Sequence, residues 1–235
     1  MKLIIDIRFS VIENAIMSDF GKPFILENKK NLSAVNTRFV LKLREIGFSL
    51  PDYDHICIRL TSSLPAGEMI NKGNYDPYHQ FFSDYHIGVS PEYFNSLKED
   101  EKITFLIYRA VALIQKFYCN SDEEKASVAR CAEIILEGGE HEKIIYKQKK
   151  ADHCIAQVVV RVLNADAFQA YVRVLKDQAV LNEVAYPRTL GRFELIFQFG
   201  TIIVNKSSVR VKPRKNSLSP LYGFSDFIVP IPPSA

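Results

Sequence analysis

The chain has 235 residues, of which 47% are hydrophobic and 24% are charged, and its formal net charge is +3 at pH 7. This composition is ordinary for a soluble globular protein, and the length suffices to bury a core without disulfides or metals. So small a net charge gives no support to a nucleic-acid or membrane partner, and no apolar run is long enough to span a bilayer.

Residues 2–12 predict a first strand, because their apolar side chains alternate with polar ones. A secretion signal would need a continuous apolar block, so this segment favours a cytoplasmic protein. The cysteines also favour a cytoplasmic protein. They are widely spaced and form no C-x-x-C pair, which predicts reduced, buried thiols. These cysteines are Cys57, Cys119, Cys131 and Cys154.

The region up to residue 84 predicts one helix, one strand and a long loop. Apolar residues at helical spacing in residues 33–46 indicate a helix that ends at Gly47, but the same run also alternates and leaves a strand open. Residues 55–60 predict a strand. Residues 61–84 are rich in Gly, Pro, Asn and aromatic residues and indicate a long loop, and long ordered loops are often functional.

The strongest structural signal lies in residues 90–117. Ser90 followed by Pro91 is typical of an N-cap and the first turn of a short helix. Ser96 and Glu99 have the spacing of a capping box that starts a second, longer helix. Apolar residues then recur at helical spacing and cover most of the helix surface, which predicts a buried core helix. No His-Glu-x-x-His occurs in the chain, so a metallopeptidase with such helix-borne zinc ligands is excluded.

A further helix is predicted directly after this one. Ser121 and Glu124 form another capping box, and a buried stripe follows that ends at Gly138 and Gly139. Together the two long helices predict a buried central helix pair in the first part of the chain.

The last third of the chain is rich in strand signals. The charged run at residues 140–150 resembles a linker or a solvated edge. It is the candidate boundary between domains of residues 1–140 and 151–235, although the length also suits one domain. Helical spacing predicts a helix at residues 166–175, and the three prolines of the tail exclude an interior strand there. Strands are predicted at residues 155–163, 180–186, 193–199, 201–204 and 209–211. The fold class that follows is α+β, with a mixed or antiparallel sheet and a strand-rich C-terminal part.

Aspartate and histidine residues gather near the aromatic-rich loop of residues 74–86. His79 and His86 with Asp76 and Asp84 have the side chains of a divalent metal site or an acid–base pair, but their spacing matches no recognised site. The chain also contains no G-x-S-x-G, no G-x-G-x-x-G and no G-x-x-x-x-G-K. The sequence therefore predicts no catalytic residue, no bound metal and no cofactor.

A basic stretch follows later in the chain. In a strand, Arg210, Lys212 and Arg214 would project from one face while Val209 and Val211 face the core. Such a basic patch has the chemistry to hold phosphate or an acidic protein surface. It is also typical of an edge strand that charge protects against pairing, and this second interpretation is the one we favour.

Residues 91–114, PEYFNSLKEDEKITFLIYRAVALI, resemble a pattern found in small bacterial immunity proteins of polymorphic toxin systems. In that family an aromatic-containing turn, a leucine and a Glu/Lys-rich cap precede an apolar helix. The resemblance covers about one tenth of the chain and transfers no functional residue. It implies a bacterial protein that neutralises a toxin by binding it.

These observations favour a non-catalytic cytoplasmic protein whose partner is another protein, such as a toxin. The loop of residues 74–86 is its predicted contact surface, because aromatic residues with a polar rim suit interface anchors. The predicted partner-binding residues are Tyr75, Tyr78, His79, Phe82, Tyr85 and His86. The alternative is an unfamiliar hydrolase or metal-binding protein that uses the Asp and His residues of the same loop.

Overall fold

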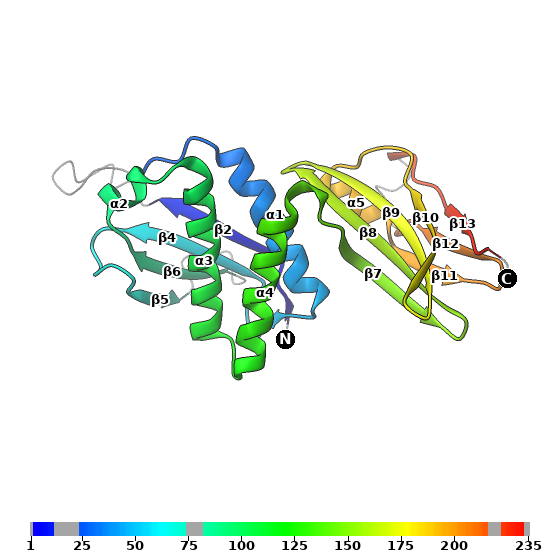
Figure 1. Ribbon diagram of the computed structural model, residues 1–235, viewed down its shortest axis with the longest axis horizontal. Coiled ribbons are helices and arrows are strands. Elements are labelled where there is room, and N and C mark those ends of the chain that lie inside the picture. Colours follow the sequence, from blue (N-terminus) through cyan, green and yellow to red (C-terminus); the bar gives the residue numbers. More distant parts are fainter. Residues whose placement is uncertain (1, 12–23, 74–81, 216–221, 233–235) are drawn as a thin grey trace. The chain divides into compact units, whose positions relative to one another are not determined.

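A computed structural model describes residues 2–11, 24–73, 82–215 and 222–232 of the chain. Within these ranges the chain forms two compact units, Met1–Gly139 and Glu140–Ala235. Each unit contains both helices and strands, which confirms the α+β class (Figure 1). A short 3-10 helix, Gly139–His141, lies where the first unit passes into the second.

The first unit is built on a mixed sheet. Its elements in chain order are β1 (Lys2–Leu3), β2 (Asp6–Val11), α1 (Lys29–Glu45), β3 (Ser49–Leu50), β4 (His55–Thr61), β5 (Met69–Gly73), β6 (Phe82–Gly88), α2 (Pro91–Ser96), α3 (Glu99–Phe117) and α4 (Asp122–Gly138). Over the described residues the sheet has the order β2-β4-β6-β5, in which β2, β4 and β6 are parallel and β5 is antiparallel. The short strands β1 and β3 pair with each other.

The core of the first unit lies between this sheet and helices α1, α3 and α4, which cover one of its faces (Figure 1). Side chains alternate along a strand, so every second residue of β4 faces the helices. Ile56 and Ile58 are completely buried there, and Phe39 of α1 and Ile107 of α3 pack in the same core. The prediction of a buried helix that ends at Phe117 is therefore confirmed.

Residues 33–46, whose pattern also left a strand open, lie in helix α1. The side chain of Asn28 caps its start, and Gly47 follows its end with a φ of 77°, a conformation that glycine adopts readily. The predicted N-cap of α2 is confirmed, because Ser90 Oγ accepts a hydrogen bond of 3.2 Å from the backbone N–H of Tyr93.

The predicted capping box of Ser96 and Glu99 is wrong. Ser96 ends α2, and α3 begins at Glu99 after Lys98. The backbone N–H of Lys98 donates to the Glu101 carboxylate at 2.8 Å, so the capping hydrogen bond forms two residues later than predicted. Several carboxylates follow one another here, and sequence spacing alone does not decide which of them caps.

The predicted long loop of residues 61–84 is interrupted by β5 and by the start of β6. Strand β6 carries polar and aromatic residues that also suit a loop, and its conformation is imposed by parallel pairing with β4. Residues 74–81 lie outside the described ranges.

The second unit consists of two antiparallel sheets and a short helix. Its elements are β7 (Ile144–Ala151), β8 (Cys154–Asn164), β9 (Ala167–Lys176), β10 (Ala179–Ala185), α5 (Arg192–Gln198), β11 (Thr201–Val204), β12 (Ser208–Lys212) and β13 (Phe227–Pro230). In the part of the chain that the structure describes, the sheets have the orders β10-β9-β8-β7 and β11-β12-β13. Val209 and Val211 are fully buried, as predicted.

Two predictions for this unit are wrong, because residues 166–175 lie in strand β9 instead of a helix and residues 193–199 lie largely in α5 instead of a strand. The charged run at residues 140–150 contains β7 and is not a linker. Strand β7 is an edge strand of its sheet with mostly partly or fully exposed residues, which agrees with the alternative of a solvated edge. In β9 the buried residues alternate strictly from Phe168 to Val174, and pairing with β8 selects this strand pattern. Apolar residues in such a run fit both the helical and the strand spacing, so pairing with a neighbouring strand decides which structure forms.

Candidate functional site

The predicted partner-binding residues divide into two groups. Tyr75, Tyr78 and His79 lie outside the described residues. Phe82 and His86 lie in β6, on the sheet face opposite the helices, because they pair with residues of β4 that also face away from the core. They therefore belong to a strand and not to a loop.

Tyr85 cannot serve as a partner contact in this structure. Its side chain points the other way from Phe82 and His86 and is only 1% exposed. Its hydroxyl lies 2.6 Å from that of Tyr118, and its ring packs 5.0 Å from the ring of Phe117. Tyr85 is a core residue, and this part of the prediction is wrong.

A polar cluster occupies the sheet face around Asp84. The Asp84 carboxylate is 1% exposed, accepts a hydrogen bond of 2.9 Å from Arg59 Nε, and lies 3.5 Å from His86 Nε2. Cys57 pairs in register with Asp84. Burial, and then the charge of Asp84, raise the pKa of the Cys57 thiol, which is unfavourable for nucleophilic chemistry.

This cluster compensates its own charges. Arg59 and His86 already engage both oxygens of Asp84. Nearby, Arg8 lies 5.0 Å from the ring of Phe82, whose face also meets the ring of His55 at 4.5 Å. The arrangement therefore supports the sheet and leaves no free carboxylate at its centre.

The pKa of His86 gives a pH-dependent stability that can be measured. Burial lowers this pKa, and Lys72 and Arg59 lower it further, while the Asp84 carboxylate, which Arg59 also contacts, opposes the shift only in part. A neutral His86 stabilises the fold above its unfolded pKa of about 6.5, and this contribution is lost as the pH falls through the lower folded pKa. We expect the free energy of unfolding to fall between about pH 7 and pH 5, in a window above the carboxylate range.

Urea titrations of wild type and His86→Gln at both pH values test this expectation. The variant should show a smaller fall, whereas His141→Gln, at a side chain that is 78% exposed, should behave like wild type. An equally steep fall in His86→Gln would contradict the assignment.

The described surface also carries an aromatic groove between α2 and α3. It has a volume of about 500 Å³. Its lining residues are Tyr93, Leu97, Asp100, Glu101, Thr104, Phe105, Tyr108 and Arg109. Those from α3 recur at i, i+4 spacing on the side of the helix opposite its buried stripe, so the groove follows directly from the helical period.

Aromatic rings form the floor and walls of this groove. The ring of Phe105 packs against the buried ring of Phe94, with ring centroids 5.9 Å apart. It also lies 5.8 Å from the ring of Tyr93. The Arg109 guanidinium lies 4.7 Å from the Phe105 ring centroid. Tyr93 and Tyr108 remain 53% and 46% exposed, which is high for large aromatic residues and leaves much of both rings open to a partner.

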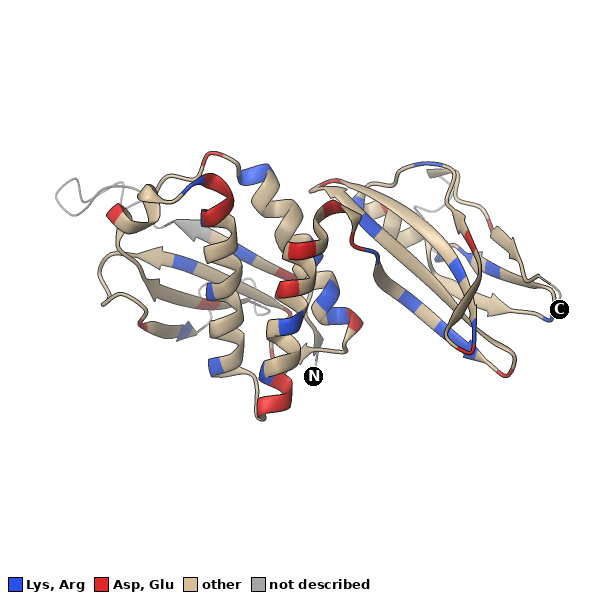
Figure 2. Cartoon of the chain, viewed as in Figure 1, with Lys and Arg blue, Asp and Glu red and all other residues tan. Residues whose placement is uncertain are grey.

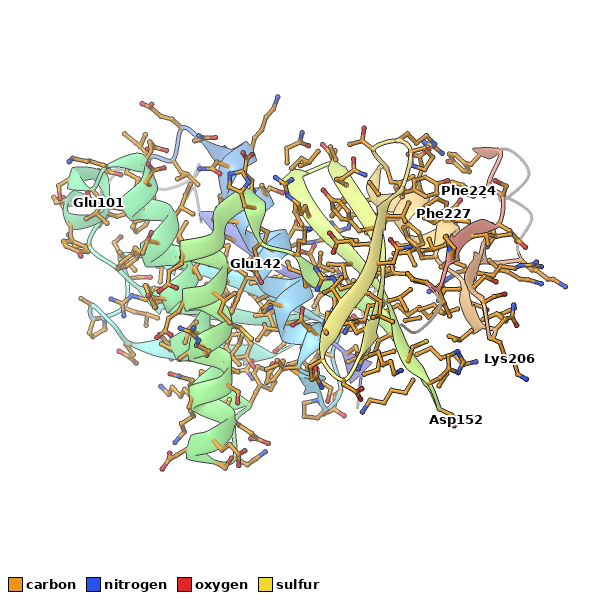
Figure 3. All side chains as sticks on the ribbon, turned by 45° about the vertical axis from the view of Figure 1, so that its right-hand side comes forward. Glu101, Glu142, Asp152, Lys206, Phe224 and Phe227 are labelled. Atoms are coloured by element: carbon orange, nitrogen blue, oxygen red, sulfur yellow. The ribbon has the colours of Figure 1, made fainter. Side chains whose placement is uncertain are left out.

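Acidic residues lie at one end of the groove, in the first turn of α3. Glu101, labelled in Figure 3, accepts a hydrogen bond from the backbone of Lys98. Asp100 lines the groove beside it. The groove therefore combines aromatic surface with two carboxylates at one end and the Arg109 guanidinium over the Phe105 ring. The sequence patterns did not predict this groove, although Tyr93 and Tyr108 fall outside the apolar stripe and are a signal of an exposed aromatic surface.

The basic patch is only partly as predicted. Arg210 and Lys212 lie on β12 as expected, and Arg214 follows the strand. However, β12 is the middle strand of its sheet, paired with β11 and β13 on its two sides. The edge-strand interpretation of this charge is therefore wrong.

The remaining chemistry is sparse. All four cysteines are free, and Cys131 and Cys154 are buried, whereas Cys57 and Cys119 are only partly so. Among the described residues, His, Cys, Asp and Glu side chains nowhere gather in a group of three that could hold a metal ion. No helix within the described ranges has the length and apolarity to cross a membrane.

Comparison with known proteins adds no relative. No protein-family model, no curated protein and no solved structure matches the chain.

Proposed function

We propose that this chain is a protein-binding protein and that the α2–α3 groove receives a segment of its partner. The observation that carries the proposal is the exposure of Tyr93 and Tyr108 in a groove that Phe105 also lines. Large aromatic residues with few accessible rotamers are enriched among the residues that contribute most to protein–protein affinity.

The charge of the groove specifies the partner segment. Asp100 and Glu101 favour a lysine or arginine side chain, and the faces of Tyr93 and Tyr108 can hold such a cation by cation–π contact. Leu97 adds apolar surface. The proposed occupant is therefore a protein segment that combines basic and apolar residues.

The resemblance of residues 91–114 to immunity proteins supports a finer proposal for the same groove, because α2 and most of α3 lie within those residues. In this proposal the partner is a bacterial toxin, and the chain masks it by binding without catalytic residues of its own. The Asp84 cluster carries no competing proposal, since Arg59 and His86 already engage its carboxylate.

A selection from a random peptide library displayed on phage tests the groove. Wild-type protein should enrich peptides with Lys or Arg beside apolar residues, and fluorescence anisotropy then gives the Kd of a selected peptide. The double variant Tyr93→Ala, Tyr108→Ala should bind it at least about tenfold more weakly, because each lost anchor costs about 1–2 kcal/mol. Both rings are exposed, so thermal stability should change little.

Tyr222→Ala is the matched control, since Tyr222 is 43% exposed and belongs to the second unit. Its Kd should equal that of wild type. Unchanged affinity in the groove double variant, or a selection that yields no peptide with Lys or Arg beside apolar residues, would overturn the proposal.

A further inference from the structure

The second unit carries an excess of positive charge that the first unit lacks. Residues 140–235 contain 14 Lys and Arg against 8 Asp and Glu, a net charge of +6, whereas residues 1–139 contain 16 against 19, a net charge of −3. Some cations of the second unit are compensated, since Lys143 and Arg173 both pair with Glu183. That cluster keeps one positive charge, so most of the excess lies elsewhere in the unit.

Part of it lies where the two sheets of this unit adjoin. Lys147 of β7 donates to the carbonyl of Gly200 just before β11, and His153 Nε2 lies 3.2 Å from the carbonyl oxygen of Asn205 just after β11. The two strands thus lie side by side and run in the same direction, and Figure 2 shows Lys and Arg along β7. Burial, and then the charge of Arg214, lower the pKa of Lys147, so cations from both sheets share this border.

The outer face of the β11–β12–β13 sheet mixes cations with apolar side chains. Arg210 lies in register between Ile203 of β11 and Ile228 of β13, and Ile228 is 52% exposed. Lys212 lies two residues further along the same face. Asp226 is the acidic group near Arg210, at 3.7 Å, and compensates one of the two cations.

A hollow of about 560 Å³ opens at the end of the unit where the β11–β12 turn lies. Its lining again combines basic and apolar side chains, namely His153, Lys176, Lys206, Leu181, Ile231 and Pro232, together with Ser207. Asp152 and Lys206, labelled in Figure 3, mark neighbouring turns at this end, which the contact between His153 and Asn205 joins.

We propose that this surface of the second unit, which we call the basic sheet face, binds an acidic segment of a protein that also carries apolar side chains. It is defined by Ile203, Lys206, Arg210, Lys212 and Ile228. Because β12 is a central strand, protection of a sheet edge does not account for its charge. A nucleic-acid backbone would satisfy the cations but would leave Ile203 and Ile228 without an apolar partner, so the surface fits a protein better.

The test uses a fluorescein-labelled peptide rich in Glu with interspersed Leu, titrated with the full chain at low salt. Two further probes are the same peptide with Gln in place of Leu, and oligothymidylate of equal charge. We expect wild type to bind the Glu/Leu peptide, and to bind the Glu/Gln peptide and the oligothymidylate more weakly. Lys206→Glu with Lys212→Glu should weaken binding of the Glu/Leu peptide by at least about tenfold.

Lys29→Glu with Lys30→Glu makes the same charge change at exposed positions in the first turn of α1 and should bind like wild type. The groove variant Tyr93→Ala, Tyr108→Ala should also bind like wild type, which separates this surface from the proposed groove. If the glutamate variant unfolds, Lys206→Gln with Lys212→Gln provides a milder loss of charge. Equal affinity of these lysine variants and wild type, or tighter binding of oligothymidylate than of the Glu/Leu peptide, would overturn the proposal.

Discussion

Replacing Leu106 by alanine should lower the free energy of unfolding of the first unit by about 2–5 kcal/mol, as deletion of a buried leucine side chain does. Leu106 is 2% exposed and lies on the face of α3 that packs against the sheet and the neighbouring helices. Its removal loses apolar burial and leaves a cavity that fixed neighbours cannot fill completely. Urea titration followed by circular dichroism measures the loss.

Leu3→Ala is the control for this prediction, because it deletes the same atoms from a leucine of the same unit that is 48% exposed. Leu3→Ala should lower the free energy of unfolding by much less than Leu106→Ala does. A loss below about 0.5 kcal/mol for Leu106→Ala, as expected of an ordinary surface site, would mean that α3 is not a core element.

Removing Arg59 should also be costly, since its partner Asp84 would remain buried. Asp84 is 1% exposed, and His86 Nε2, at 3.5 Å, is a group beside it that can take up a proton. Breaking a buried ion pair by removing one partner typically costs about 3–5 kcal/mol. We expect Arg59→Met to fall near the lower end of that range, because protonation of His86 can replace part of the lost charge.

Two measurements separate this electrostatic cost from lost packing. NMR titration should show a higher pKa for His86 in Arg59→Met than in wild type. The double variant Arg59→Met, Asp84→Leu removes the orphaned carboxylate and should regain most of the lost stability. If the double variant were as unstable as Arg59→Met, or the pKa of His86 did not rise, the ion pair would not be the source of the loss.

The sequence predicts helices here more reliably than strands, and the reason is physical. The apolar stripe of α3 extends over several turns, and a local serine caps α2. Strand β9 and helix α5 each carry apolar residues at spacings that fit both a strand and a helix. Their conformations depend on partners distant in sequence, such as β8 for β9, which a local pattern does not contain.

The site shows the same limit in a different way. Clustered aromatic residues do not reveal which of them face the core, and Tyr85 is buried because the pleat of β6 alternates it with Asp84 and His86. Conversely, Tyr93 and Tyr108 come together only because a turn places α2 beside α3. The helical spacing can predict that an aromatic side chain is exposed. It cannot predict which other element forms the opposite side of the groove, because that depends on tertiary packing.

Mapping of amide chemical shifts tests the central claim most directly. Uniformly nitrogen-15-labelled protein is titrated with the peptide selected on wild type. The groove model predicts that the largest shifts fall on Tyr93, Thr104 and Tyr108 and vanish in the Tyr93→Ala, Tyr108→Ala variant. Largest shifts in residues 82–86, or on β11 and β12, with the amides of α2 and α3 unmoved, would contradict it.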